Sequence, residues 1–148
     1  MKDTQVKGKW ALVTGASSGI GKEMARQLAS DGVNLILTAR REDRLKELAQ
    51  ELKSKHQIQV ATLSVDLSKV DGPSQLFQKA KDISPRIHVL INNAGIGQYG
   101  DFKNIPLSNH LSIIQLNITT PTELCHLFIE HALVHGEKSC LLYTSDAA

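Results

Sequence analysis

The sequence predicts an α/β fold, a doubly wound parallel sheet, from two observations. Short apolar runs alternate along the chain with longer segments in which apolar residues recur at intervals of three and four. The short runs are too short for helices and rich in Val, Ile and Leu: Trp10–Thr14, Asn34–Ala39, Gln59–Ser64 and Val89–Asn92. This alternation is typical of parallel strands joined by crossover helices.

The segments between these strands are expected to be helices. The clearest has one apolar face, formed by Leu45, Leu48, Ala49 and Leu52. The helix before it would pack through Ile20, Met24, Ala25 and Leu28, and the helix after it through Leu76, Phe77 and Ala80. A fourth helix should run from about residue 107 to 135, with a kink at Pro121.

The composition is that of one globular domain, with 148 residues, of which 41% are hydrophobic and 22% charged. The net charge is +2 and the basic residues are mixed with acidic ones, so neither a nucleic-acid nor a membrane partner is expected. The chain lacks a secretory signal pattern, which favours a cytoplasmic protein. Cys125 and Cys140 form no disulfide or zinc pattern, and His131 and His135 lack a third ligand, so no metal site is predicted.

A glycine-rich segment, Thr14–Gly21, directly follows the first strand and opens a helix. Glycines at positions 15, 19 and 21 allow a phosphate to approach free backbone N–H groups and the positive end of the helix dipole. The spacing G-x-x-x-G-x-G differs from the common G-x-G-x-x-G pattern. The segment therefore indicates a pyrophosphate site, the alternative being a plain turn in which glycines serve packing.

The second strand ends in Thr38-Ala39-Arg40-Arg41, without a carboxylate. In dinucleotide folds an acid at this place suits a free ribose 2′-hydroxyl, whereas an arginine suits a 2′-phosphate. NADP(H) is therefore favoured over NAD(H), with Arg40 as the expected phosphate contact. The alternative is that both arginines are solvated residues at a helix start, with Glu42 and Asp43 as partners.

Three further pieces follow in order along the chain: Asp66-Leu67, Asn92-Asn93-Ala94-Gly95 and Asn117. Together with Thr14–Gly21 they resemble the short-chain dehydrogenase/reductase family, from about Lys7 to about Lys138. The resemblance implies that Asp66 and Leu67 contact the adenine, that Asn92 and its neighbours line the cofactor, and that Asn117 is catalytic, holding a water in a proton relay. The full set of expected cofactor-binding residues is Gly15, Ser17, Ser18, Gly19, Ile20, Gly21, Arg40, Arg41, Asp66, Leu67, Asn92, Ala94 and Gly95.

Each of these residues also has a simpler explanation when it is taken alone. Asp66 is suited to a helix N-cap, and Asn92-Asn93 to a turn. Asn117 is suited to capping carbonyls near Pro121. Their joint occurrence in the family's order is what favours the functional interpretation.

The resemblance also implies a catalytic tyrosine with a lysine four residues later. Tyr99 and Lys103 have that spacing but fall in a loop, where contact with substrate is a better prediction for Tyr99, and no lysine follows Tyr143. We therefore expect an intact parent that moves a hydride between the nicotinamide and a small carbonyl or alcohol substrate, and an inactive 148-residue chain. The rival hypothesis is a relative that binds or senses dinucleotide without catalysis.

The last nine residues, 140–148, resemble the translation of a sequencing adapter. We expect residues 1–139 to be a dinucleotide-binding domain that is truncated after about its fourth or fifth strand, and 140–148 to be a non-native tail. Because the family commonly forms dimers or tetramers, the parent is expected to be a homo-oligomer.

Overall fold

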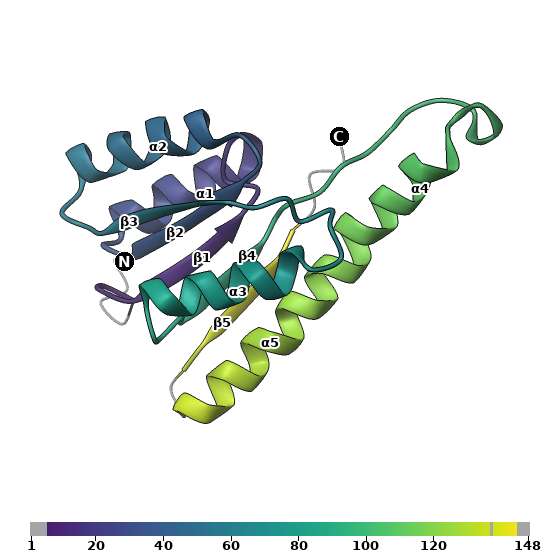
Figure 1. The fold of residues 1–148 in the computed structure, drawn as a ribbon. Coiled ribbons are helices and arrows are strands. Elements are labelled where there is room, and N and C mark those ends of the chain that lie inside the picture. Colours follow the sequence, from purple (N-terminus) through teal and green to yellow (C-terminus); the bar gives the residue numbers. More distant parts are fainter. Residues whose placement is uncertain (1–5, 137, 145–148) are drawn as a thin grey trace.

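A computed structural model describes residues 6–136 and 138–144, and within these residues five strands form one parallel sheet (Figure 1). The strand order is β3-β2-β1-β4-β5, and every neighbouring pair is parallel. The strands are β1 (Trp10–Thr14), β2 (Asn34–Ala39), β3 (Val60–Ser64), β4 (Val89–Asn92) and β5 (Cys140–Tyr143). The predicted α/β class is confirmed, and the expected strands differ from β1 to β4 only in that β3 begins at Val60.

Helices cover both faces of the sheet, with α1 and α2 on one side and α3 and α5 on the other (Figure 1). The α-helices are α1 (Gly19–Ser30), α2 (Glu42–Lys55), α3 (Gly72–Ile83), α4 (Leu107–Ile114) and α5 (Thr120–His135). A short 3-10 helix, η1 (Phe102–Asn104), precedes α4, and a π-helical turn, η2 (Gln115–Thr119), joins α4 to α5. No helix in the described ranges combines the length and apolar character needed to cross a membrane.

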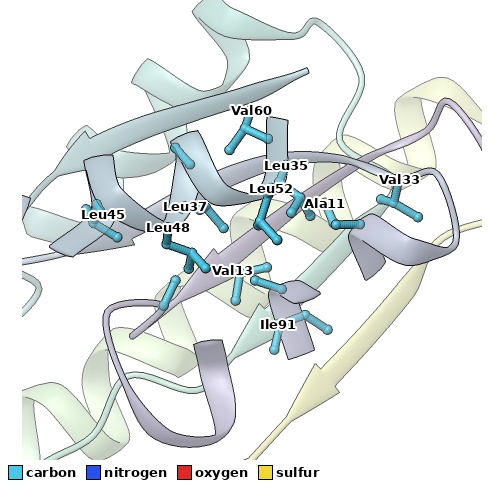
Figure 2. Packing of buried hydrophobic residues seen from close by; sticks show 14 of the residues in the cluster. Ala11, Val13, Val33, Leu35, Leu37, Leu45, Leu48, Leu52, Val60 and Ile91 are labelled. Carbon is cyan, nitrogen blue, oxygen red and sulfur yellow. The ribbon is translucent and has the colours of Figure 1, made fainter. Parts of the chain in front are cut away.

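The core has two halves because successive side chains of a strand point to opposite faces. Ala11 and Val13 of β1 pack under α1 and α2, in the cluster shown in Figure 2. Leu12, between them, packs under α3 and α5 with Ile36 and Leu90. All three β1 residues are fully buried, so the central strand is clamped from both sides.

The helices α2 and α3 bury the apolar faces that the sequence predicts. The prediction for α1 was wrong at Ile20, a residue that is 42% exposed. Small residues take its place, since Gly21, Ala25 and Ala29 are the buried positions of α1. A helix that meets the sheet through glycine and alanine can approach it closely, and Ile20 is left on the outer side of that contact.

The expected long helix is present, and its irregularity lies in η2, immediately before Pro121. A proline at 121 has no N–H to donate to the carbonyl of Asn117, four residues earlier. The N–H of Thr120 instead bonds to the carbonyl of Gln115, five residues earlier, which is the π-helical pattern. The predicted kink at Pro121 therefore takes the form of one widened turn.

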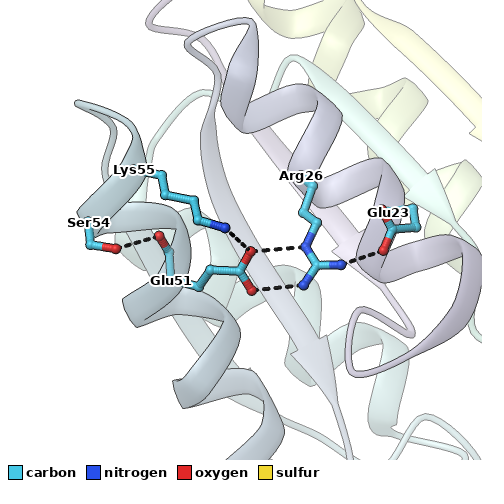
Figure 3. Close-up of polar contacts among 5 residues, drawn as sticks. All are labelled: Glu23, Arg26, Glu51, Ser54 and Lys55. Atoms are coloured by element: carbon cyan, nitrogen blue, oxygen red, sulfur yellow. Dashed lines mark hydrogen bonds and ion pairs between the residues drawn. The ribbon is translucent and has the colours of Figure 1, made fainter.

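A charge cluster ties α1 to α2 on the outer surface (Figure 3). Arg26 donates from Nε and Nη2 to the two carboxylate oxygens of Glu51, at 3.1 and 2.9 Å, and Lys55 donates to the same carboxylate at 3.0 Å. The hydrogen bonds from Arg26 and then Lys55 lower the pKa of Glu51 to about 2. Because Arg26 and Lys55 face solvent, this cluster orients the two helices more than it stabilises them.

On the other side of the sheet, His131 fastens α5 to the start of β4. Its Nε2 accepts a hydrogen bond of 3.1 Å from the backbone N–H of Ile87, and its ring meets the edge of Phe77 and the ring of His135. An Nε2 that accepts from an amide carries no proton, so the ring is neutral. Burial first, and then the charges of His135, Lys81 and His88, lower the pKa of His131.

We predict that mild acidity loosens this contact. Because the pKa of His131 is lower in the folded than in the unfolded chain, its contribution to stability is present above about pH 6.5 and is lost as the pH falls through the folded pKa. The free energy of unfolding can be measured with urea at about pH 7.5 and about pH 5. Between these two pH values, His131→Gln should lose less stability than the wild type loses. The exposed His126→Gln is the control, and equal pH dependence in wild type and His131→Gln would contradict the prediction.

Candidate functional site

A cleft of about 280 Å³ lies at the carboxyl ends of the central strands. The strand order reverses between β1 and β4, because β2 and β3 continue on one side of β1 and β5 lies beyond β4. Open α/β sheets bind ligands at such a point. The cleft is lined by Gly15, Ser17, Ser18, Ala39, Arg40, Arg41, Asp66, Leu67, Asn93, Ala94, Gly95, Ile96 and Leu116.

The glycine-rich turn packs directly on the end of β4. Gly15 has a φ of +67°, and a Cβ there would lie 2.8 Å from Nδ2 of Asn93. A Cβ at Gly21 would collide with the same nitrogen and lie 2.6 Å from the carbonyl oxygen of Gly15. Glycine is required at both positions because no side chain fits between the turn and β4.

Thr14 and Asn93 hold this contact together. The hydroxyl of Thr14 donates to the carbonyl of Ile91 at 3.2 Å and accepts from the N–H groups of Asn93 and Ala94 at 2.9 and 3.0 Å. The Asn93 amide group donates to the carbonyls of Thr14 and Gly15, each at 3.3 Å. Its Oδ1 is buried and has no hydrogen-bond partner within the described part of the chain, which leaves an acceptor at the cleft.

The first turn of α1 is open to an anion. Its N-cap residue, Ser18, makes no side-chain capping bond, and the turn contains no acidic residue. The N–H groups at a helix start need acceptors, and the helix dipole adds a partial positive charge there. A phosphate group satisfies both requirements, so the turn fits a pyrophosphate.

Two arginines occupy the neighbouring wall, and Arg41 is the one held in place. Its Nη2 donates to the hydroxyl oxygens of Ser17 and Ser18 at 3.2 and 3.1 Å, which joins the start of α2 to the glycine-rich turn. Its neighbour Glu42 pairs with Lys46 instead. The sequence prediction preferred Arg40, which also lines the cleft, but the hydrogen bonds to the turn are made by Arg41.

Asp66 and Leu67, after β3, form a further part of the cleft. Oδ1 of Asp66 accepts from the backbone N–H and the hydroxyl of Ser68, at 3.0 and 2.6 Å. These hydrogen bonds lower the pKa of Asp66, and the bond from the Ser68 hydroxyl has the larger effect. Since α3 begins at Gly72, Asp66 shapes this corner of the chain and is not the helix N-cap.

Asn117 lies in η2 and grips the loop that follows β4. Its Oδ1 accepts from the N–H of Ile96 at 3.0 Å, and its Nδ2 donates to the carbonyl of the same residue at 2.8 Å. Both polar atoms of the side chain thus bind a backbone partner outside its helix, and the side chain does not cap carbonyls near Pro121. Its own carbonyl accepts from the hydroxyl of Tyr143 at 3.3 Å.

Not all the expected site residues line the cleft. Gly21 lies behind the turn, and the side chain of Asn92 points to Cys125, whose sulfur it meets at 3.3 Å. Gly19, Ile20 and Asn117 are also outside the lining, so their predicted roles stay predictions. Four residues that line it are absent from the set of expected cofactor-binding residues: Ala39, Asn93, Ile96 and Leu116. Asn93 had a signal, since it stands beside Asn92, whereas Leu116 had none beyond its helical spacing.

The chain is similar in sequence to a known protein family and to individual oxidoreductases. The family described as short chain dehydrogenase matches residues 9–145. An uncharacterized oxidoreductase, YvaG, of Bacillus subtilis is 32% identical over 97% of this chain and 53% of its own length. A very-long-chain 3-oxoacyl-CoA reductase-A of Danio rerio is 35% identical over 95% of this chain and 44% of its own length.

Solved structures with this fold include complexes with NADP or NADPH. A short-chain dehydrogenase from Sphingobium yanoikuyae in complex with NADPH has a TM-score of 0.85 and 32% identity, over 91% of this chain and 52% of that one. A metagenomic short-chain oxidoreductase in complex with NADP has a TM-score of 0.87 and 28% identity, over 93% and 62%. The chain thus spans about half the length of the relatives that it matches.

We predict that Gly21→Ala destabilises the fold by about 1–3 kcal/mol, because the added methyl group has no space between α1 and Asn93. The loss should appear in thermal or urea unfolding although alanine favours a helix more than glycine does. Lys22→Ala, on the adjoining position of α1, is the matched control. If Gly21→Ala were as stable as the wild type, the turn would not depend on this contact.

Proposed function

The chain belongs to the short chain dehydrogenase family, and from that premise we propose that it is the dinucleotide-binding part of an oxidoreductase that uses NADP(H) in preference to NAD(H). The observation that carries the proposal is Arg41, held by Ser17 and Ser18 beside a turn suited to phosphate. When bound, the reduced cofactor would supply a hydride to a carbonyl carbon, and the oxidised cofactor would accept one from an alcohol carbon. The chain's own residues would bind and orient it.

The cleft offers a place for each part of the cofactor. The glycine-rich turn and the first turn of α1 would hold the pyrophosphate, and Asp66 with Leu67 would border the adenine. The unpartnered Oδ1 of Asn93 offers a further acceptor. These residues come from the ends of β1, β3 and β4, so the fold itself assembles the site.

The preference for NADP(H) follows from charge. Arg40 and Arg41 line the same wall, and no carboxylate occupies the end of β2, where it could accept from a free 2′-hydroxyl. A guanidinium binds a phosphate through parallel charge-assisted hydrogen bonds, and Arg41 is already oriented by two serine hydroxyls. Relatives of known structure hold NADP or NADPH, which supports the same choice.

We propose that the remaining chemistry depends on residues outside this sequence. A carbonyl that receives a hydride needs a proton donor, and Tyr99, which has Lys103 four residues later, is 87% exposed in the loop before η1. Asn117 would position the loop after β4 at the cleft through its two bonds to Ile96. A parent of the relatives' length would act on a small carbonyl or alcohol, and its cytoplasmic location stays a prediction.

The apolar residues of α4 and η2 support the proposal that the parent is a homo-oligomer. Leu107, Leu111, Ile114 and Ile118 are each at least 47% exposed. A helical face of this kind is stable in water when another apolar surface covers it. The alternative function is that of a relative that binds or senses dinucleotide without catalysis, and an intact sequence without a Tyr-x-x-x-Lys motif would favour it.

We predict that Arg41→Gln weakens NADPH binding by about tenfold more than it weakens NADH binding. The lost charge would pair with the 2′-phosphate of NADPH, whereas the lost hydrogen bonds to Ser17 and Ser18 affect both cofactors alike. Titration of the 148-residue chain with each cofactor, followed by nicotinamide fluorescence, measures both affinities. Arg44→Gln, on the exposed side of α2, is the matched control. Equal losses for NADPH and NADH in Arg41→Gln would contradict the assignment.

We also predict that the 148-residue chain does not consume NADPH with a simple ketone, although it binds the cofactor. Absorbance at the nicotinamide band measures consumption, and a parent extended to the relatives' length should restore it. Rapid consumption by the 148-residue chain would overturn the proposal that the proton donor lies outside it. An extended parent that binds NADPH without turnover would favour the sensing alternative.

A further inference from the structure

Thr120, the first residue of α5, joins two parts of the site that lie far apart in the sequence. Its hydroxyl donates to the carbonyl of Leu67 at 2.6 Å, across 53 positions of the chain. Thr120 is 2% exposed and Leu67 is 4% exposed, so water does not compete for this bond. The hydrogen bond therefore connects the long helix directly to the corner that follows β3.

The same corner is already held on its other sides. The carboxylate of Asp66 is bound by Ser68, and the backbone of Gly72 packs so closely that a Cβ there would lie 2.5 Å from the carbonyl oxygen of Asp66. The corner has no space to move toward α3. On the side of α5, the Thr120 hydroxyl is the polar group that holds it.

A threonine in a helix usually satisfies its hydroxyl within the helix. Thr122, two residues later, does so by donating to the carbonyl of Ile118 at 2.7 Å. Thr120 follows directly on the π turn and donates outside its helix. Two threonines in one helix thus make different hydrogen bonds, one local and one to the wall of the cleft.

We propose that Thr120 is a positioning residue for the adenosine half of the cofactor, an inference that rests on the proposed function. Leu67 lines the cleft, and its carbonyl accepts the hydrogen bond of the Thr120 hydroxyl from α5. Without the hydroxyl, a buried carbonyl has no partner, and the corner shifts to regain one. The wall that borders the adenine then moves from its bound position.

The test uses Thr120→Val, which keeps the shape of the side chain and removes the hydroxyl. The probe is 2′,5′-ADP, the adenosine half of NADP(H), titrated into the 148-residue chain by calorimetry. We expect Thr120→Val to bind it about tenfold more weakly, the effect of one buried hydrogen bond. Thr120→Ser should restore the affinity, and Thr122→Val should leave it unchanged because its hydroxyl bonds within the helix.

The outcomes separate this inference from the proposed function. If the wild type fails to bind 2′,5′-ADP, the proposed function itself is wrong. If the wild type binds and Thr120→Val binds equally well, or Thr120→Ser fails to restore the affinity, the role of Thr120 is overturned alone. Phe128→Leu, which alters the core on the side of the sheet covered by α3 and α5, is the control for a general loss of stability. If Phe128→Leu weakened the binding of 2′,5′-ADP as much as Thr120→Val does, a specific role for Thr120 would be overturned as well.

Discussion

The structure depends on the close contact between the glycine-rich turn after β1 and the end of β4. Thr14 and Asn93 exchange hydrogen bonds across these neighbouring strands, and the space between Gly15 and Asn93 admits no side chain. Because β1 is buried on both faces, this contact is transmitted to the whole sheet. The contact also fixes the direction of α1, whose first turn faces the cleft. One packing constraint thus serves both the core and the phosphate site.

The long helix that runs through α4, η2 and α5 is a second constraint. It contacts the site at the carboxyl ends of the strands and also the chain at the amino end of β4. Asn117 and Thr120 bind backbone groups of two different loops at the cleft, and His131 binds the backbone before β4. All three make hydrogen bonds to main-chain groups, so they specify the path of the loops whatever side chains the loops carry. The π turn before Pro121 lies between the two parts of this helix, at the site.

Much of the fold could be predicted from the sequence because its signals are local. Apolar runs and helical periodicity located β1, β2, β4 and the packing faces of α2 and α3. Ile20 was misplaced because the periodicity marks an apolar residue and does not reveal that glycine and alanine make the closer contact. The choice between Arg40 and Arg41 depended on side-chain direction at the end of a strand, and the partner of Thr120 lies 53 residues away. Such contacts follow from the tertiary structure alone.

The measurement that most directly tests the central claim is an NMR titration of the ¹⁵N-labelled 148-residue chain with NADPH. If NADPH binds in the cleft at the carboxyl ends of the strands, the amide resonances of Gly15–Gly21, Arg41 and Asp66–Ser68 should shift. The resonances of α3 and of the last half of α5 should change little. Shifts confined to other surfaces, or none at saturating NADPH, would contradict the assignment of this cleft as the dinucleotide site.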